Sequence, residues 1–132
     1  MKKIRIIWGG NIIFDLSINN KTKVANKDKI QVSSSSDSYD LLKNCFNPNN
    51  VEHIESAVLL MLNRANKVLG WAKISSGGIT GTVMDPKVIF QLALNTNASN
   101  IILSHNHPSG NLKPSQADKE ITRQIKKGGD IL

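Results

Sequence analysis

The sequence predicts an α/β domain, in which a mixed, curved sheet is flanked by helices. Two observations favour this class. Short apolar runs bounded by Gly, Asn and Pro are typical of strands, and between them lie segments with apolar residues at helical spacing. The length of 132 residues, 39% of them hydrophobic and 20% charged, suits one globular core. Strands that alternate with helices predict a layer of helices packed on a sheet.

The N-terminal segment, residues 1–32, is predicted to be a separate strand hairpin whose role the sequence leaves open. Residues 4–8 and 11–16 are mostly apolar and flank Gly9-Gly10. Two successive glycines suit the positive φ angles of a tight hairpin turn. The main domain is predicted to be the second region, residues 33–132.

The first half of this domain is predicted to hold one helix and a second hairpin. Residues 19–29 are polar, and a serine run at 33–36 leads into a helix that we expect to begin near Asp37. Apolar segments at 57–62 and 67–74 are joined by four polar or small residues, which is the pattern of two strands and a turn.

The second half is predicted to be helix, strand, helix. Asp85 is a favourable cap before a proline, and apolar residues recur at helical spacing up to about Asn97. A short strand is expected at 101–103. The last helix is expected at 115–127, stopped by the glycine pair that follows it.

Two histidines after this strand suggest a metal site. His105 and His107 are two residues apart, so in an extended segment they lie on one face, with Cα atoms about 7 Å apart. Asp118 follows a loop rich in Pro and Gly, in the first turn of the last helix, and can approach the same point. Two histidines, one aspartate and a water molecule form the open tetrahedron of a catalytic zinc site.

Composition limits the cellular location and the binding partners that the sequence predicts. Cys45 is the only cysteine, so one chain can form neither an internal disulfide nor a cysteine zinc cluster, and we expect a cytoplasmic location. The N-terminal apolar run is interrupted by Arg5 and reads as a strand, not as an export signal. No apolar run reaches the roughly 20 residues that span a bilayer. The net charge of +7 is scattered and favours at most weak, non-specific nucleic-acid binding.

Five motif positions resemble one known family. A glutamate, Glu55, precedes a His-x-His motif, which is followed after seven residues by Ser115 and after two more by Asp118. With the segments 63–70, 74–78 and 85–87, this pattern resembles the RadC-like branch of the JAMM/MPN (JAB) zinc metalloprotease superfamily. The resemblance covers residues 33–132.

This resemblance implies a fold, a site and an activity. The expected fold is the JAMM/MPN sandwich, similar to that of cytidine deaminases, although relatives continue into a further strand where this sequence stops. The resemblance makes His105, His107 and Asp118 the zinc ligands, Glu55 the general acid/base and Ser115 the stabiliser of the developing oxyanion. It implies a zinc-dependent hydrolase of peptide or isopeptide bonds, in a family historically linked to DNA repair.

Other interpretations of these residues remain open. Ser115 and Asp118 also match a helix capping box, which is compatible with zinc ligation by Asp118. A zinc deaminase is excluded because its signature needs a Pro-Cys-x-x-Cys segment, which a chain with one cysteine lacks. A non-catalytic RadC-type module that binds nucleic acid or protein is the main alternative. Basic residues of the last helix form either a phosphate-binding stripe or a solvated face: Lys119, Arg123, Lys126 and Lys127.

Overall fold

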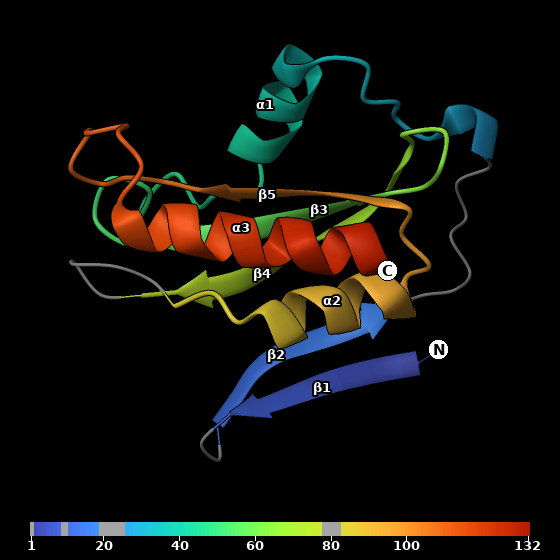
Figure 1. Ribbon diagram of the computed structural model, residues 1–132, viewed down its shortest axis with the longest axis horizontal. Helices are drawn as coiled ribbons and strands as arrows, with labels where there is room; N and C mark the ends of the chain where they lie inside the picture. The colour runs from blue at the N-terminus through green and yellow to red at the C-terminus, as the bar shows by residue number, and fades with distance from the viewer. Residues whose placement is uncertain (1, 9–10, 19–25, 78–82) are drawn as a thin grey trace. The chain divides into compact units, whose positions relative to one another are not determined.

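The computed structural model describes residues 2–8, 11–18, 26–77 and 83–132 (Figure 1). It divides into two compact units, Met1–Ile30 and Gln31–Leu132. Among the described residues, no helix is long and apolar enough to cross a membrane.

The first unit contains the predicted strand hairpin. Strands β1 (Lys2–Trp8) and β2 (Asn11–Ile18) pair antiparallel, and a one-residue irregularity lies between Ile6 and Ile7. The predicted glycine turn lies outside the described residues. A single turn of 3₁₀ helix, η1, follows at Asn26–Asp28.

The second unit is an α/β domain, as predicted. Its elements in chain order are α1 (Ser35–Lys43), β3 (Ser56–Leu62), β4 (Val68–Ser76), α2 (Pro86–Asn95), β5 (Asn100–His105) and α3 (Gln116–Ile131). The strand order is β4-β3-β5, and both pairs are antiparallel, where a mixed sheet was expected. Since β4 and β5 both run opposite to β3, they run parallel to each other. A crossover segment must therefore connect β4 to β5, and α2 lies in this segment.

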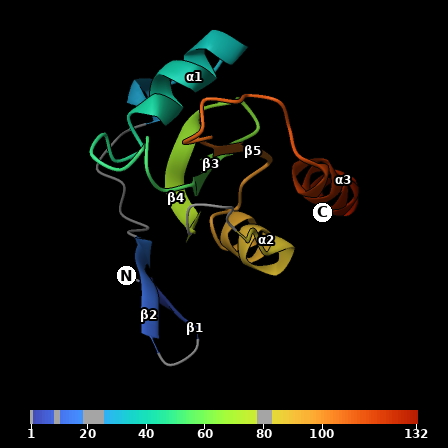
Figure 2. The same ribbon diagram turned by 90° about the vertical axis from the view of Figure 1, so that its left-hand side faces the viewer.

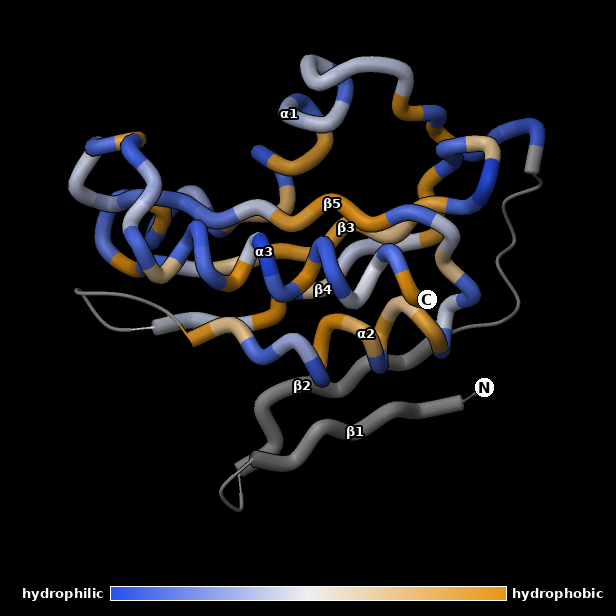
Figure 3. Tube along the Cα trace, viewed as in Figure 1, coloured by the Kyte–Doolittle hydropathy of each residue, from blue (hydrophilic) through white to orange (hydrophobic). Residues whose placement is uncertain are grey.

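Strand β3 is the centre of the core. None of its residues is more than 8% exposed. Its side chains alternate between two faces. Val58, Leu60 and Leu62 cluster with Leu42 of α1, whereas α2 and α3 lie on the other face of the sheet (Figure 2). Hydrophobic residues accordingly dominate α2 and the middle of β5 (Figure 3).

The predicted second hairpin is confirmed, and an asparagine organises its turn. The Asn63 side-chain oxygen accepts the backbone N–H groups of Ala65 and Lys67, both at 2.9 Å. Asn66 has a φ of 57°, in the left-handed region that asparagine tolerates better than most residues. The connection therefore folds back tightly, and β4 returns beside β3.

Helix α1 begins earlier than predicted. The serine run supplies its N-cap, Ser34, whose hydroxyl accepts the Asp37 N–H at 3.1 Å. The Asp37 carboxylate in turn accepts the Ser34 N–H at 3.0 Å. Asp37 is therefore the third residue of the helix and not its first, because the capping box needs the serine three positions upstream.

Helix α2 starts as predicted, with Asp85 as N-cap and a proline at its first position, and it ends slightly early at Asn95. Helix α3 departs from the prediction because it continues through both glycines to Ile131. Gly128 packs against α2, where a Cβ atom would lie 2.4 Å from the Phe90 ring. This glycine provides space for helix packing and does not end the helix.

Candidate metal centre

The first two predicted ligands come from the end of β5 and the turn after it. His105 is the last residue of the strand and pairs with Ala57 of the central strand. His107 follows two residues later, beyond the end of the strand. The His107 carbonyl oxygen accepts the Gly110 N–H at 2.9 Å, and Gly110 adopts a left-handed φ of 76°. This glycine lets the chain turn immediately after the histidines.

The first turn of α3 supplies the third predicted ligand. Asp118 is the third residue of the helix, and Ser115 is its N-cap. The Asp118 N–H donates to the Ser115 hydroxyl oxygen at 3.1 Å, and the Ser115 N–H donates to Asp118 Oδ2 at 2.7 Å. The capping box predicted from sequence is therefore confirmed, and it fixes the carboxylate at the start of the helix.

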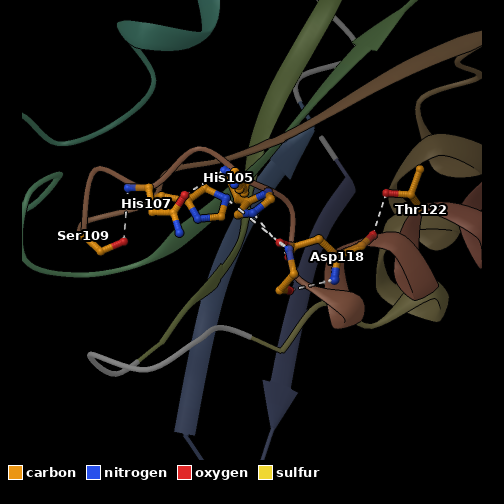
Figure 4. A network of polar contacts seen from close by, with 8 residues as sticks. His105, His107, Ser109, Asp118 and Thr122 are labelled. Carbon is orange, nitrogen blue, oxygen red and sulfur yellow. Dashed lines mark hydrogen bonds and ion pairs between the residues drawn. The ribbon is translucent and has the colours of Figure 1, made fainter.

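The three side chains converge on one point (Figure 4). His105 Nε2 lies 3.3 Å from Asp118 Oδ1, and His107 Nε2 lies 4.0 Å from Asp118 Oδ2. One ligand atom from each residue lies within 4.8 Å of the other two. The side chains are 14–20% exposed, so the group sits at a shallow depth that solvent reaches.

This arrangement fits a zinc ion. Bonds of about 2.0–2.1 Å in a tetrahedron place neighbouring ligand atoms roughly 3.3 Å apart, which matches the His105–Asp118 distance. His105 Nε2 is buried and has no hydrogen-bond partner within the part of the chain that the structure describes. Buried polar atoms normally have partners, so this nitrogen is suited to a metal. Three protein ligands leave a fourth position for water.

The surroundings of Asp118 favour its charged form. Desolvation raises the pKa of its carboxyl group, but hydrogen bonds with the Ser115 backbone and hydroxyl lower it, as do His105 and His107. The balance holds the pKa below its ordinary value. A carboxylate must be deprotonated to ligate a metal, so Asp118 is in the required state at neutral pH.

The fourth predicted residue, Glu55, stands one position before β3 and is half-buried. Its carbonyl oxygen accepts the Gly77 N–H at 2.8 Å, which fixes its backbone to the end of β4. Two residues later, Ala57 pairs with His105, so the Glu55 backbone lies at the end of the sheet where the ligands gather. Glu55 is not among the three residues whose ligand atoms converge. Its predicted role in proton transfer stays a prediction.

Comparison with known proteins identifies the family. A model of the RadC-like JAB domain matches residues 32–132. This chain belongs to the RadC-like JAB domain family. The predicted membership in the RadC branch of the JAB/MPN superfamily is therefore confirmed.

Several relatives of the RadC-like JAB domain are UPF0758 proteins. That of Flavobacterium johnsoniae is 45% identical over 102 residues, which cover 77% of this chain and 43% of the relative. The relative in Chlorobaculum parvum is 42% identical over 81 residues, which cover 61% of this chain and 36% of the relative. The relative in Chlorobaculum tepidum is 34% identical over 120 residues, which cover 91% of this chain and 52% of the relative. The chain thus spans about half the length of these relatives, or less.

Sequence reasoning missed the role of one residue in the RadC-like JAB domain. Asn106, between the two histidines, donates from Nδ2 to the carbonyl oxygens of Val51 at 2.6 Å and Ile54 at 2.9 Å. Its Oδ1 accepts the Ser56 N–H at 2.7 Å. The sequence shows only that an amide side chain stands within the metal motif. Its hydrogen-bond partners lie about 50 residues earlier, so no local pattern predicts them.

A cleft of about 950 Å³ opens beside the histidines of the RadC-like JAB domain. Helix α1 and residues 44–53 line one part of it, and residues 104–112 line another. Tyr39 and Leu112 lie on the cleft and are 68% and 81% exposed. A concave surface of apolar side chains with a few polar groups is typical of a ligand-binding site.

The basic residues of α3 are partly paired. Arg123 forms an ion pair with Glu120, and Lys126 Nζ lies 3.5 Å from Asp130 Oδ2. Two of the four cations grouped by the sequence analysis therefore have acidic neighbours on the same helix. This pairing weakens a phosphate-binding stripe and agrees better with a solvated helix face.

Proposed function

We propose that this RadC-like JAB domain is a zinc-dependent hydrolase of amide bonds, with peptide or isopeptide substrates. The observation that supports it most directly is the convergence of His105, His107 and Asp118, with a buried His105 nitrogen that has no hydrogen-bond partner among the described residues. This donor set matches a catalytic zinc site, which keeps a position open for water.

Zinc at such a site lowers the pKa of a bound water molecule towards about 7 and polarises the substrate carbonyl. The role that we propose for Glu55 is proton transfer. Its carboxylate would accept a proton from the attacking water and deliver it to the leaving nitrogen as the C–N bond breaks. Water is consumed, and an acid and an amine are released.

Ser115 has a second proposed role besides capping. Its hydroxyl oxygen accepts the Asp118 N–H, but a hydroxyl also carries one proton that it can donate. Ser115 would donate this proton to the carbonyl oxygen on which negative charge develops. Removing a donor of this kind from other enzymes costs about 2.7–4 kcal/mol of transition-state stabilisation.

The cleft beside the histidines supports a substrate with an apolar group near the scissile bond. Phe46 and Leu112 line it together with both histidines. A peptide or isopeptide substrate would place a bulky side chain there and its amide bond at the metal.

The proposal is tested with a library of internally quenched peptides and one isopeptide-linked pair. The zinc-loaded chain should cleave a subset of these substrates, and mass spectrometry should locate new termini at amide bonds. Glu55→Gln is the matched control, because it changes one functional group and keeps the ligands. Cleavage equal to that of Glu55→Gln, or cleavage that survives complete zinc removal, would refute the proposal.

A non-catalytic module remains the second candidate, supported by the net charge of +7. It predicts salt-sensitive binding to nucleic acid without dependence on zinc. A role in DNA repair belongs to this candidate, whereas a cytoplasmic location is proposed with either one. Metal content and peptide cleavage discriminate between the two candidates.

A further inference from the structure

Asn106 connects the metal ligands to the segment that carries Glu55. Besides the contacts of its side chain, the Asn106 N–H donates to the Ser56 carbonyl oxygen at 3.3 Å. Both backbone groups of Ser56 are therefore held by one residue, through its main chain and its side chain. The Ile54 carbonyl oxygen is held by the same side chain. Asn106 thus binds the backbone on both sides of Glu55.

The ladder between β3 and β5 does not reach Glu55. This pairing ends at Ala57 and His105. Glu55 stands two residues before this last pair. The hydrogen bonds of Asn106 continue the connection past the end of this ladder. Together with the bond from the Gly77 N–H to the Glu55 carbonyl, they fix Glu55 from β4 and from the histidine turn.

The chemistry of these contacts requires an amide side chain. Nδ2 donates to two carbonyl oxygens, and Oδ1 accepts one N–H group. A rotated amide would place two N–H donors against each other and an oxygen against two carbonyl oxygens, so the orientation is fixed. Aspartate has the same shape but cannot donate, and alanine makes none of these contacts.

We infer that Asn106 is a positioning residue, which holds Glu55 at a set distance from the zinc ligands. This inference rests on the proposed function, in which Glu55 transfers the proton. A proton-transfer group works only within hydrogen-bond reach of the water, and a shift of about 1 Å costs on the order of 10²-fold in rate. Asn106 is not one of the three converging residues, and it acts through the backbone of residues 51–56.

The test compares Asn106→Asp and Asn106→Ala with Asn63→Ala. Asn63 is a matched control because its side chain also holds backbone N–H groups, at the opposite end of β3. The probe is the fastest-cleaved quenched peptide from the library described above. Both Asn106 variants should lower kcat by tenfold to a hundredfold, with KM and bound zinc within twofold of the unmodified chain. Asn63→Ala should retain the kcat of the unmodified chain.

A double variant tests whether the loss of kcat in the Asn106 variants depends on Glu55. In a Glu55→Gln background, adding Asn106→Ala should change the residual rate by less than twofold, because residues that act as one unit are not additive. Unchanged kcat in both Asn106 variants would overturn the inference. Zinc loss parallel to the loss of activity, or a full effect of Asn106→Ala in the Glu55→Gln background, would also overturn it.

Hydrogen exchange provides a readout that needs no activity. Amides in residues 54–56 should exchange at least tenfold faster in Asn106→Ala than in Asn63→Ala. If the unmodified chain cleaves nothing but this exchange effect is seen, the proposed hydrolase fails while the positioning of Glu55 by Asn106 stands. Equal exchange in the two variants refutes the positioning itself.

Discussion

Ser115 and Asp118 hold each other by hydrogen bonds in both directions. The Ser115 N–H donates to Asp118 Oδ2, and the Asp118 N–H donates to the Ser115 hydroxyl oxygen. The other carboxylate oxygen, Oδ1, lies 3.3 Å from His105 Nε2. One carboxylate therefore accepts the Ser115 N–H through Oδ2 and approaches His105 through Oδ1, so capping and zinc ligation are compatible.

The purified chain should bind one equivalent of zinc through the three converging side chains. Elemental analysis after dialysis against a weak chelator measures the stoichiometry. His105→Ala should lose most of the metal, because two remaining ligands bind zinc weakly. His53→Ala removes the histidine outside the group and serves as the control. Equal zinc content in His105→Ala and the unmodified chain would show that the ligands are assigned wrongly.

Glu55→Gln should separate proton transfer from metal binding. The amide has nearly the same size but cannot accept the proton, so hydrolysis should fall by about 10²–10⁴-fold to a small residual rate while zinc content stays at one equivalent. Peptide cleavage and elemental analysis of the same preparation check both statements. Loss of zinc would make Glu55 a ligand instead, and full activity would remove it from the mechanism.

The two glycines of α3 should respond oppositely to alanine. A Cβ atom added at Gly129 would meet no other part of the described chain within 4 Å, so Gly129→Ala should stabilise the protein by about 0.5–1 kcal/mol through higher helix propensity. Gly128→Ala should destabilise it, because the added Cβ collides with Phe90. Urea denaturation measures both changes.

A compensating substitution tests the cause of the Gly128 effect. Phe90→Leu shortens the opposing side chain, so Gly128→Ala should cost less stability in that background than in the unmodified chain. If the cost is the same in both backgrounds, contact with Phe90 is not its origin.

The charged Asp118 should stabilise the metal-free fold at neutral pH. Its pKa in the folded protein is lowered from the ordinary 3.8. A lowered pKa contributes stability above the pKa of the unfolded chain, and this contribution is lost as pH falls through the folded value. The difference in unfolding free energy between the unmodified chain and Asp118→Asn should thus be largest near pH 6 and shrink below about pH 4.

Urea denaturation of metal-free protein at several pH values measures this difference. Asp130→Asn, an exposed aspartate near the end of the same helix, controls for general effects of acidic charge. A difference for Asp118→Asn that grows towards acid would contradict the assigned direction of the pKa shift.

Any binding to DNA should be electrostatic and independent of zinc. Aromatic residues make up only 5% of the chain, so contacts to phosphates should dominate over base stacking. Fluorescence anisotropy should show affinity that falls steeply with salt and weakens when Lys119, Arg123 and Lys127 are changed to glutamine. Sequence-selective binding that resists salt, or that disappears with the metal, would favour the nucleic-acid module.

The element types were largely predictable because their signals are local. A proline after Asp85 starts α2, and four polar residues between apolar runs make the β3–β4 turn. The end of α3 was predicted wrongly because Gly128 is required by Phe90, a residue 38 positions away. Local patterns do not contain such a contact.

In the candidate site, too, local patterns predict some features and not others. The three converging residues could be grouped from the spacing of His105, His107 and Asp118, because consecutive elements carry them. The contacts of Asn106 could not, because its partners lie about 50 residues earlier and only the pairing of β5 with β3 brings them close.

The helix cap at Ser115 and the strand pairing of His105 are made by hydrogen bonds between protein groups. Each ligand-bearing element is thus preorganised by its own hydrogen bonds, unlike the small domains that fold only when zinc arrives. Little ordering entropy is left to oppose metal uptake. We therefore expect the folded domain to lose and regain a bound zinc ion without unfolding.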